Sequence, residues 1–226
     1  WNPERLPYEK LGAYSEAWAA REFGAAHAAE IARLIDGYTK LNRRRTPELL
    51  EPETYSLVHY REAERVLGEW RELVKSAEAI ESALPAGHRD AFYQLVLYPV
   101  KAGAGVQELY VSAGLNRLYA LQGRVSVNRE AARVRALFAE DNALAKRYNE
   151  LGGGKWNHMM DEVNFGYTYW QTPPIEVMPA VAEVKPNAGA VPGLALEGDP
   201  HGRPRWGTPP EVLPSIDRVR RNIRWV

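Results

Sequence analysis

The feature that most constrains the fold is a stripe of apolar residues at helical spacing near the middle of the chain. Between Glu53 and Leu84 the stripe consists of Ala63, Val66, Leu67, Trp70, Leu73, Ala77, Ile80 and Leu84. Apolar residues that recur every three or four positions lie on one face of an α-helix, and that face must be buried against other elements. The stripe therefore predicts a long helix over about residues 53–84, packed within a helical bundle.

Shorter stripes predict further helices on both sides. One begins at Leu11, is interrupted at Gly24, and resumes from Ala28 to Tyr38. Thr46 is expected to cap a short turn that opens with Pro47, since proline suits the first position of a helix. These signals add two helices and a turn before the long central helix.

Two more helices are predicted after the turn Pro85-Ala86-Gly87. The first covers about residues 89–121, and we expect a kink or break at Pro99, which lacks an N–H and clashes with the preceding turn. Asn128 is expected to cap the second, which runs to about Leu151 and is stopped by three glycines, residues 152–154. Gly103, Gly105 and Gly114 either weaken the first of these helices or allow close packing.

The composition changes after residue 171. Ten of the 16 prolines lie from Thr172 onward, and helical periodicity disappears there. The last stretch, IDRVRRNIRWV, alternates apolar and charged residues, which fits either a short helix or a strand. We therefore predict an all-α protein with a four- to five-helix antiparallel bundle in residues 1–171. Residues 172–226 form a Pro-rich extended arm, laid against a neighbour.

Charge and composition exclude several classes of function. Lys plus Arg and Asp plus Glu both number 29, which argues against a nucleic-acid partner or a polybasic membrane anchor. The chain has no cysteine, so it has no disulfide and no thiolate metal site. No apolar run approaches the roughly 20 residues of a membrane span. Nucleotide-binding, serine-hydrolase and zinc-protease motifs are absent, and Gly152–Lys155 follows a helix instead of opening one. No cofactor is predicted.

His158 and Asp161 lie three residues apart, a spacing that would place both on one face of a helix. Such a pair can serve a metal or a general base. A zinc site needs three or four protein ligands, and the remaining histidines do not complete a cluster. The favoured interpretation is that the two side chains satisfy each other or nearby backbone groups, with no metal.

Aromatic residues gather just after the glycine run. Phe165, Tyr167, Tyr169 and Trp170, with Trp156 upstream, could stack on sugar rings as flat platforms with a polar handle. The alternative is that they pack the end of the bundle or an interface, and the residues alone favour packing.

Two charged features are further candidates. Arg43, Arg44 and Arg45 could clamp a carboxylate, although solvation or salt bridges between domains are the more common role of such a triplet. Asp141 lies on the apolar seam between Phe138 and Ala145, so we expect it to be partly buried with a shifted pKa. A hydrogen bond to a tyrosine or a backbone cap is the favoured explanation for Asp141.

One long segment resembles a known family. KWNHMMDEVNFGYTYWQTPPIEVMP is similar to the signature of glycoside hydrolase family 115, the xylan α-1,2-glucuronidases. IARLIDGYTKLNRRRTPELL, FYQLVLYPVKAGAGVQELY, LALEGD and LPSID support the resemblance in the same order. Glu162 stands where the family pattern has Gln, and Asn164 stands where it has His.

The resemblance implies an enzyme that removes glucuronic or 4-O-methylglucuronic acid from glucuronoxylan or its oligosaccharides with inversion. It also implies that the catalytic carboxylates lie on a (β/α)8 barrel before the bundle, and that a β-sandwich follows. No catalytic residue is carried onto this chain. Since the sequence does not begin with Met, we expect an internal piece that is inactive alone. The polymeric substrate of the family implies a secreted or periplasmic location.

Three hypotheses follow. The first is a helical domain that packs against the barrel through Arg43, Arg44, Arg45, His158 and Asp161. The second is a carbohydrate-binding module that holds xylan through Trp156, Tyr167, Tyr169 and Trp170. The third is a docking or homodimerisation module that presents an exposed apolar patch.

Overall fold

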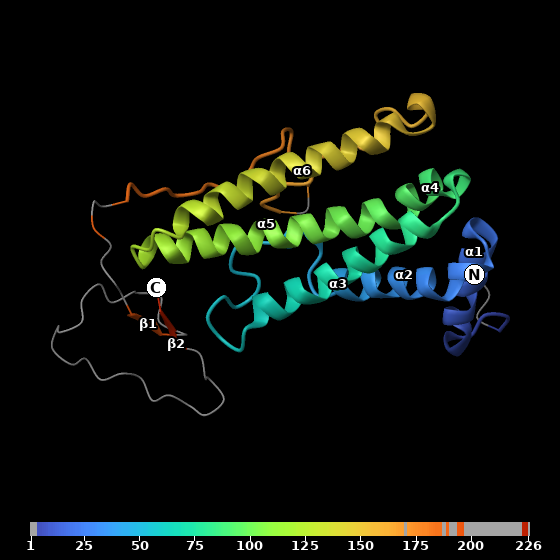
Figure 1. The fold of residues 1–226 in the computed structure, drawn as a ribbon, viewed down its shortest axis with the longest axis horizontal. Helices are drawn as coiled ribbons and strands as arrows, with labels where there is room; N and C mark the ends of the chain where they lie inside the picture. Colours follow the sequence, from blue (N-terminus) through green and yellow to red (C-terminus); the bar gives the residue numbers. More distant parts are fainter. Residues whose placement is uncertain (1–3, 170, 187–188, 190–193, 197–222, 226) are drawn as a thin grey trace.

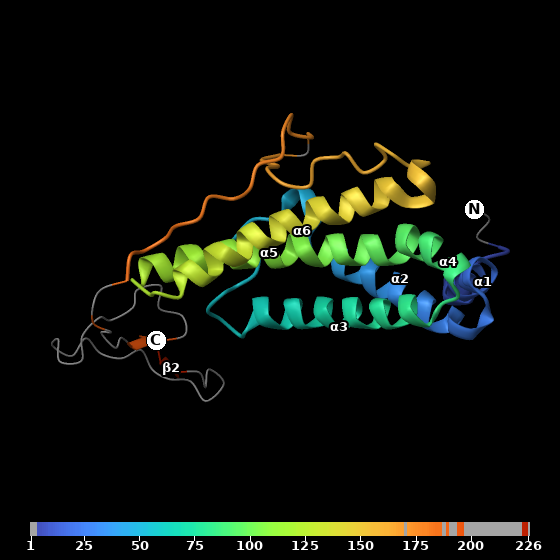
Figure 2. The same ribbon diagram turned by 45° about the horizontal axis from the view of Figure 1, so that its top comes forward.

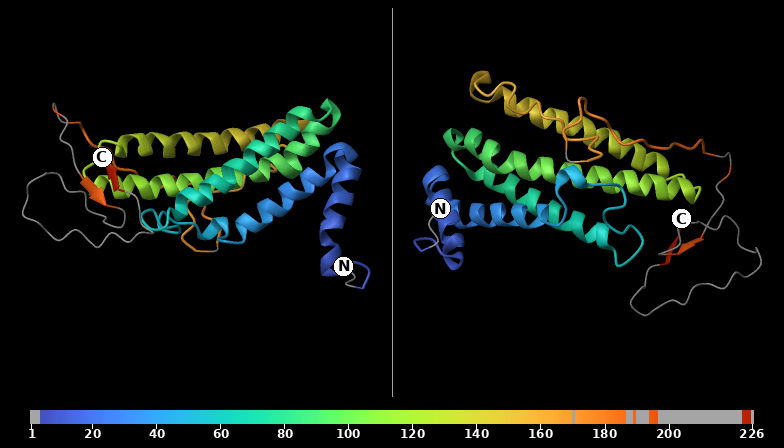
Figure 3. Two further views of the ribbon diagram at one scale, coloured as in Figure 1. Left: turned by 60° about the horizontal axis from the view of Figure 1, so that its bottom comes forward. Right: turned by 180° about the vertical axis from the view of Figure 1, so that it is seen from behind.

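The computed structural model describes residues 4–169, 171–186, 189, 194–196 and 223–225. Its helices are α1 (Leu11–Phe23), α2 (Ala28–Asn42), α3 (Glu62–Ala83), α4 (Ala86–Phe92), α5 (Tyr98–Leu121) and α6 (Val127–Gly154). From α2 to α6 the long helices lie side by side and alternate in direction (Figures 1 and 2). Helix α1 crosses one end of them (Figure 3). The predicted all-α antiparallel bundle is therefore confirmed.

The glycines end helices as predicted. Gly24, with φ of 89°, closes α1, and Gly152 and Gly153, with φ of 59° and 70°, break the last turn of α6. Thr46 stands at the N-cap of a 3-10 turn (Pro47–Leu49) that opens with Pro47, as predicted, although its side chain makes no capping hydrogen bond. The predicted cap at Asn128 is wrong, because Asn128 lies inside α6.

The start of α3 also differs from the prediction. The helix begins at Glu62, because Tyr60 and Arg61 adopt left-handed backbone conformations with φ of 56° and 52°. The Glu62 carboxylate accepts a hydrogen bond from the Ser56 amide at 2.8 Å, which ties the preceding loop to the first turn. Residues 51–61 are therefore a loop, and the apolar stripe begins only after it, at Ala63.

Pro99 is accommodated by a local widening of the helix. A π-helical turn, Tyr93–Leu97, joins α4 to α5, and the Tyr98 amide donates to the Tyr93 carbonyl. The predicted disruption is thus present as a π-bulge just before the proline. The bulge turns Tyr93 inward, where its hydroxyl donates to the Leu144 carbonyl at 2.9 Å and links the bulge to α6.

The core lies between α3, α5 and α6 and extends under α1 and α2. Trp70 of the predicted stripe is 1% exposed and sits at its centre. Gly103 on α5 faces this indole so closely that a Cβ at position 103 would lie 2.8 Å from Trp70 Cη2. Close helix packing, one of the two roles predicted for the α5 glycines, is therefore the role of Gly103.

The described first part of the arm, residues 172–186, is extended as predicted and runs along α6 (Figure 2), whereas most of residues 187–222 lie outside the described residues. Asn116 of α5 and Asn128 of α6 each pair with one arm residue in both directions. The Asn116 amide donates to the Ala182 carbonyl at 2.9 Å and accepts from the Ala182 N–H at 2.7 Å. Asn128 does the same with Val184 at 2.8 and 2.9 Å. The two asparagines therefore hold alternate arm residues, as a neighbouring strand would.

Two short strands complete the described residues. β1 (Leu194–Leu196) and β2 (Ile223–Trp225) pair antiparallel, with Ala195 opposite Arg224. Of the two conformations predicted for the alternating stretch, the strand is the one present at residues 223–225. The domain boundary after residue 171 stays a prediction.

Candidate functional site

Residues 155–178, called the closing segment from here on, fold back over α5 and α6. Phe165 is fully buried, with its ring centroid 5.5 Å from that of Phe138 and 6.3 Å from that of Tyr110. The Val177 N–H donates to the Phe165 carbonyl at 3.3 Å, which closes a loop around the buried ring. Both contacting rings lie in the middle of their helices, so Phe165 packs the side of the bundle and not its end.

A buried polar contact lies beside Phe165. Asp141 of α6 is 5% exposed, and its Oδ2 accepts a hydrogen bond from Asn164 Nδ2 at 2.7 Å. Burial raises the pKa of Asp141 to about 6, and the nearby Glu176 carboxylate adds to the rise. Burial was predicted from the seam on which Asp141 lies, but the expected partner, a tyrosine or a backbone cap, is wrong. The partner, Asn164, is one of the two side chains that depart from the family pattern.

A cleft of about 540 Å³ opens between α6 and the closing segment. Its walls carry carboxylates and amides, among them Asp141, Asn149, Asp161, Glu162, Asn164 and Glu176. Hydrogen-bond acceptors therefore dominate the cleft, an arrangement suited to hydroxyl-rich ligands and unsuited to anions.

The predicted aromatic residues do not form one platform. Tyr169 is 54% exposed, and its hydroxyl donates to Gln171 at 3.0 Å. Tyr167 is half-buried, and so is Trp156, which has the Lys155 ammonium 4.9 Å from its ring centroid. Trp170 lies outside the described residues. Tyr169 is thus the most available of the three described aromatics.

His158 and Asp161 do contact each other, at 2.6 Å between Nδ1 and Oδ2. The contact lies in a series of turns after α6, because the glycine run ends the helix, so the predicted shared helix face is wrong. The bond from His158 lowers the pKa of Asp161, to which Asn149 also donates at 2.8 Å. Both partners are exposed, and in the part of the chain that the structure describes no three His, Asp or Glu side chains form a metal site.

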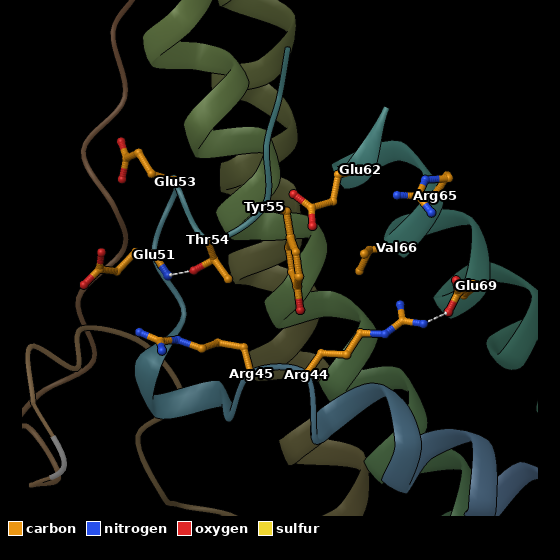
Figure 4. A pocket seen from close by; sticks show the side chains of 10 residues that line it. All are labelled: Arg44, Arg45, Glu51, Glu53, Thr54, Tyr55, Glu62, Arg65, Val66 and Glu69. Carbon is orange, nitrogen blue, oxygen red and sulfur yellow. Dashed lines mark hydrogen bonds and ion pairs between the residues drawn. The ribbon is translucent and has the colours of Figure 1, made fainter. Parts of the chain in front are cut away.

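Two residues of the arginine triplet, Arg44 and Arg45, border a second pocket, of about 770 Å³, between the end of α2, the following loop and α3 (Figure 4). Arg44 and Arg45 extend in opposite directions across it. Arg44 reaches α3 and pairs with Glu69, whereas Arg45 Nε donates to the Leu49 carbonyl at 2.8 Å. The two guanidinium groups therefore do not clamp one carboxylate together, and Arg43 does not line this pocket.

Tyr55 stands between the two arginines in Figure 4 and is 8% exposed. Its hydroxyl and the side-chain amide of Gln107 are neighbours, but neither makes a hydrogen bond of ordinary geometry within the described residues. Burial is the main cause that raises the pKa of Tyr55, and the two arginines act in the opposite direction. Tyr55 was missed in the sequence because the loop that holds it was predicted to be helix.

None of the helices in the described part of the chain has the length and apolar character that a membrane span requires.

Like Tyr55, Asn116 and Asn128 were missed in the sequence, here as residues that hold the arm. A single asparagine within a helix gives no sequence signal for a partner more than 50 residues away.

Comparison with known proteins gave one family match and similar solved structures. Residues 1–49 match the model of glycosyl hydrolase family 115, a range that ends with the arginine triplet and its following turn. No curated protein matches the chain significantly in sequence. One similar solved structure is described as a novel family GH115 4-O-methyl-α-glucuronidase, BtGH115A, with specificity for decorated arabinogalactans.

The similarity to BtGH115A has a TM-score of 0.60 at 26% identity, over 81% of this chain and 25% of that one. The chain therefore spans about a quarter of the length of the solved structure that it matches. The resemblance predicted from the sequence is confirmed: the chain is similar, in its first 49 residues and in its fold, to a helical part of a glycosyl hydrolase family 115 enzyme.

Proposed function

We propose that the chain is the helical accessory domain of an α-glucuronidase, which packs against the catalytic barrel and has no catalytic residue of its own. The observation that carries the proposal is the extent of the structural match. Most of this bundle corresponds to only a quarter of a 4-O-methyl-α-glucuronidase, which leaves three quarters of that enzyme for other parts. The substrate would be glucuronoxylan or another polysaccharide decorated with 4-O-methylglucuronic acid, which is a polymer outside the cell and implies secretion or periplasmic export.

The chemistry of the clefts supports an accessory role. Glycoside hydrolysis needs two carboxyl groups that flank one bond, one of them with a raised pKa. Asp141 has the raised pKa, but it is buried and its Oδ2 is bound by Asn164 of the closing segment. Asp161 is held by His158 and Asn149 and has a lowered pKa. Neither carboxyl group is free to meet a glycosidic oxygen while the closing segment is in place.

The pocket at Arg44 and Arg45 is the proposed contact with the barrel. Arg45 keeps its terminal nitrogens for an outside acceptor, because only its Nε is bound within the described residues. Arg65 has no ion pair among the described residues and faces the same pocket. An acidic loop of the neighbouring domain could therefore be bound here by charge-assisted hydrogen bonds.

Variants of the full-length enzyme test this contact. Arg45→Ala should lower the activity on 4-O-methylglucuronoxylan and separate the unfolding of the bundle from that of the barrel in calorimetry. Arg43→Ala, a neighbouring charge outside the pocket, is the matched control, and Glu69→Gln removes only the internal partner of Arg44. If Arg45→Ala and Arg43→Ala behave alike in both assays, the pocket is not the contact.

Carbohydrate binding is the second candidate, favoured by the exposure of Tyr169 on the closing segment, which also forms one wall of a cleft rich in acceptors. Stacking on one tyrosine and hydrogen bonds from the cleft would hold a neutral xylan backbone. Calorimetry of the chain with glucuronoxylan, beside a Tyr169→Ala variant, distinguishes this role. Equal heats of binding for the wild type and the variant would show that Tyr169 does not contact the sugar. No heat of binding for either protein would contradict carbohydrate binding.

A further inference from the structure

Asp141 of α6 is buried and is joined to the closing segment by the hydrogen bond from Asn164. Asn149, at the end of the same helix, makes two further bonds to the segment, with Asp161 and the Met160 N–H. The partner, Asn164, also donates its backbone N–H to the Glu176 carboxylate at 3.2 Å. Asn164 thus connects three parts of the chain, namely α6, the closing segment before Phe165, and the loop that returns after it. A change in the charge of Asp141 acts directly on this connection.

The groups around Asp141 make the charged form of its carboxyl group unfavourable. From α5, the Tyr98 hydroxyl faces Asn164 and the carboxyl group, and burial together with that carboxyl group raises the pKa of Tyr98 to about 12. Tyr98 is therefore a neutral neighbour at ordinary pH. From the closing segment, Glu176 adds a like charge. Both neighbours that act on Asp141 through space thus leave its negative charge uncompensated.

None of the cations near Asp141 in the described residues forms an ion pair with it, and most of them have other partners. The groove on its other side, between α3, α5 and α6, is lined by Lys75, Glu78, Lys101, Glu108, Arg133 and Glu140. Lys101 is 2.8 Å from Glu78, and Arg133 is 3.0 Å from Glu108. In the cleft, Lys146 is 3.8 Å from Glu150, while Asp161 and Glu162 add further negative charge. No cation in the described residues is therefore paired with Asp141.

We propose that Asp141 is a titratable latch, which holds the closing segment more tightly when its carboxyl group is protonated than when it is charged. In the protonated state Asn164 still donates to the carbonyl oxygen of the carboxyl group. The new O–H can then donate to Glu176, whose carboxylate repels the charged form of Asp141. The buried site no longer holds an uncompensated charge. The segment therefore loosens as the pH rises.

The size of the effect follows from linkage. In the latched state Asp141 titrates near a pH of about 6, and after release it regains its ordinary value of 3.8. The latched state therefore binds the proton more tightly, and latching weakens as the pH rises through that interval. Between pH 4.5 and pH 7.5 the latching equilibrium should fall roughly 30-fold, since each unit of pKa difference is worth a factor of ten.

Amide hydrogen exchange of the chain measures the latch. Protection factors of residues 163–169 and 175–178, corrected for intrinsic exchange rates, should fall roughly 30-fold between pH 4.5 and pH 7.5. Those of core residues in α5 should stay high at both values. Asp141→Asn, which keeps the shape and the hydrogen bond without the titration, should abolish the pH dependence. Glu162→Gln, a neighbouring cleft carboxyl, should keep it.

Asn164→His provides an independent check. A protonated imidazole would pair with charged Asp141, so the protection should no longer fall between pH 4.5 and pH 6. Its loss should move above the ordinary histidine pKa of about 6.5. The proposal is overturned if the wild-type protection is independent of pH, if Asp141→Asn retains the slope, or if the closing segment exchanges only together with the core. None of these outcomes depends on whether the parent enzyme releases glucuronic acid.

Discussion

Asn116 allows a sharp prediction about how the arm is held. Its side chain is fully buried, and its amide donates to the Val127 and Ala182 carbonyls and accepts from the Ala182 N–H. Asn116→Ala removes all three bonds. Each is worth about 1 kcal/mol net, and a buried group left unpaired costs about 1–3 kcal/mol more. The Val127 carbonyl stays in the α6 helix, and the arm can turn its own groups toward water, so we expect a total loss of about 2–4 kcal/mol.

Chemical denaturation in urea measures this loss, and for a chain of this size a loss of 3 kcal/mol corresponds to a fall of about 6–12 °C in Tm. Hydrogen exchange locates it, since the Ala182 and Val184 amides should lose protection before the core does. Asn142→Ala is the matched control, because the Asn142 amide donates only to Phe138 within its own exposed helix turn at 3.0 Å. An Asn116→Ala protein with unchanged stability and unchanged arm protection would refute the reasoning.

Three further predictions concern packing and pH. Gly103→Ala places a Cβ 2.8 Å from Trp70 and should cost about 1–3 kcal/mol of unfolding free energy, whereas Gly105→Ala on the same helix meets no atom within 4 Å and should stabilise by about 0.5–1 kcal/mol. Equal effects in urea denaturation would contradict the close approach. Phe165→Ala should cost about 3–5 kcal/mol, since the ring is fully buried, and a cost below 1 kcal/mol would show that the closing segment is not part of the core. Asp141 should contribute up to about 3 kcal/mol of stability below its unfolded pKa, and this contribution should be lost as the pH rises through about 6. Subtracting the pH profile of Asp141→Asn from that of the wild type isolates it, and a difference that increases with pH would contradict the sign.

The helices were predictable because the apolar residues that they bury recur at helical spacing in the sequence. Trp70, Ile80 and Leu84 belong to one stripe, and all are buried in the structure. Glycine and proline act within one turn, so the ends of α1 and α6 and the disruption near Pro99 were also predictable. The start of α3 was not predictable, because Tyr60 and Arg61 adopt left-handed backbone conformations, which Tyr and Arg residues rarely do.

The candidate site was predictable only in parts. Asp141 was singled out by its place on an apolar seam, and Asn164 by its departure from a family pattern. Their pairing joins residues 23 positions apart and depends on how the glycine run directs the chain. The opposed directions of Arg44 and Arg45 likewise depend on Glu69 in α3 and on the turn at Leu49. Residue identity thus indicated which groups matter, and tertiary contacts decided what each one faces.

The release of glucuronic acid from 4-O-methylglucuronoxylan and from decorated arabinogalactan tests the central claim most directly. The chain alone should be compared with a longer chain that adds the preceding barrel. The account predicts release by the longer chain only, with this chain as a supporting domain. Release by the 226-residue chain alone, abolished by Asp161→Asn or Glu162→Gln, would contradict it and would place catalysis in the cleft beside the closing segment.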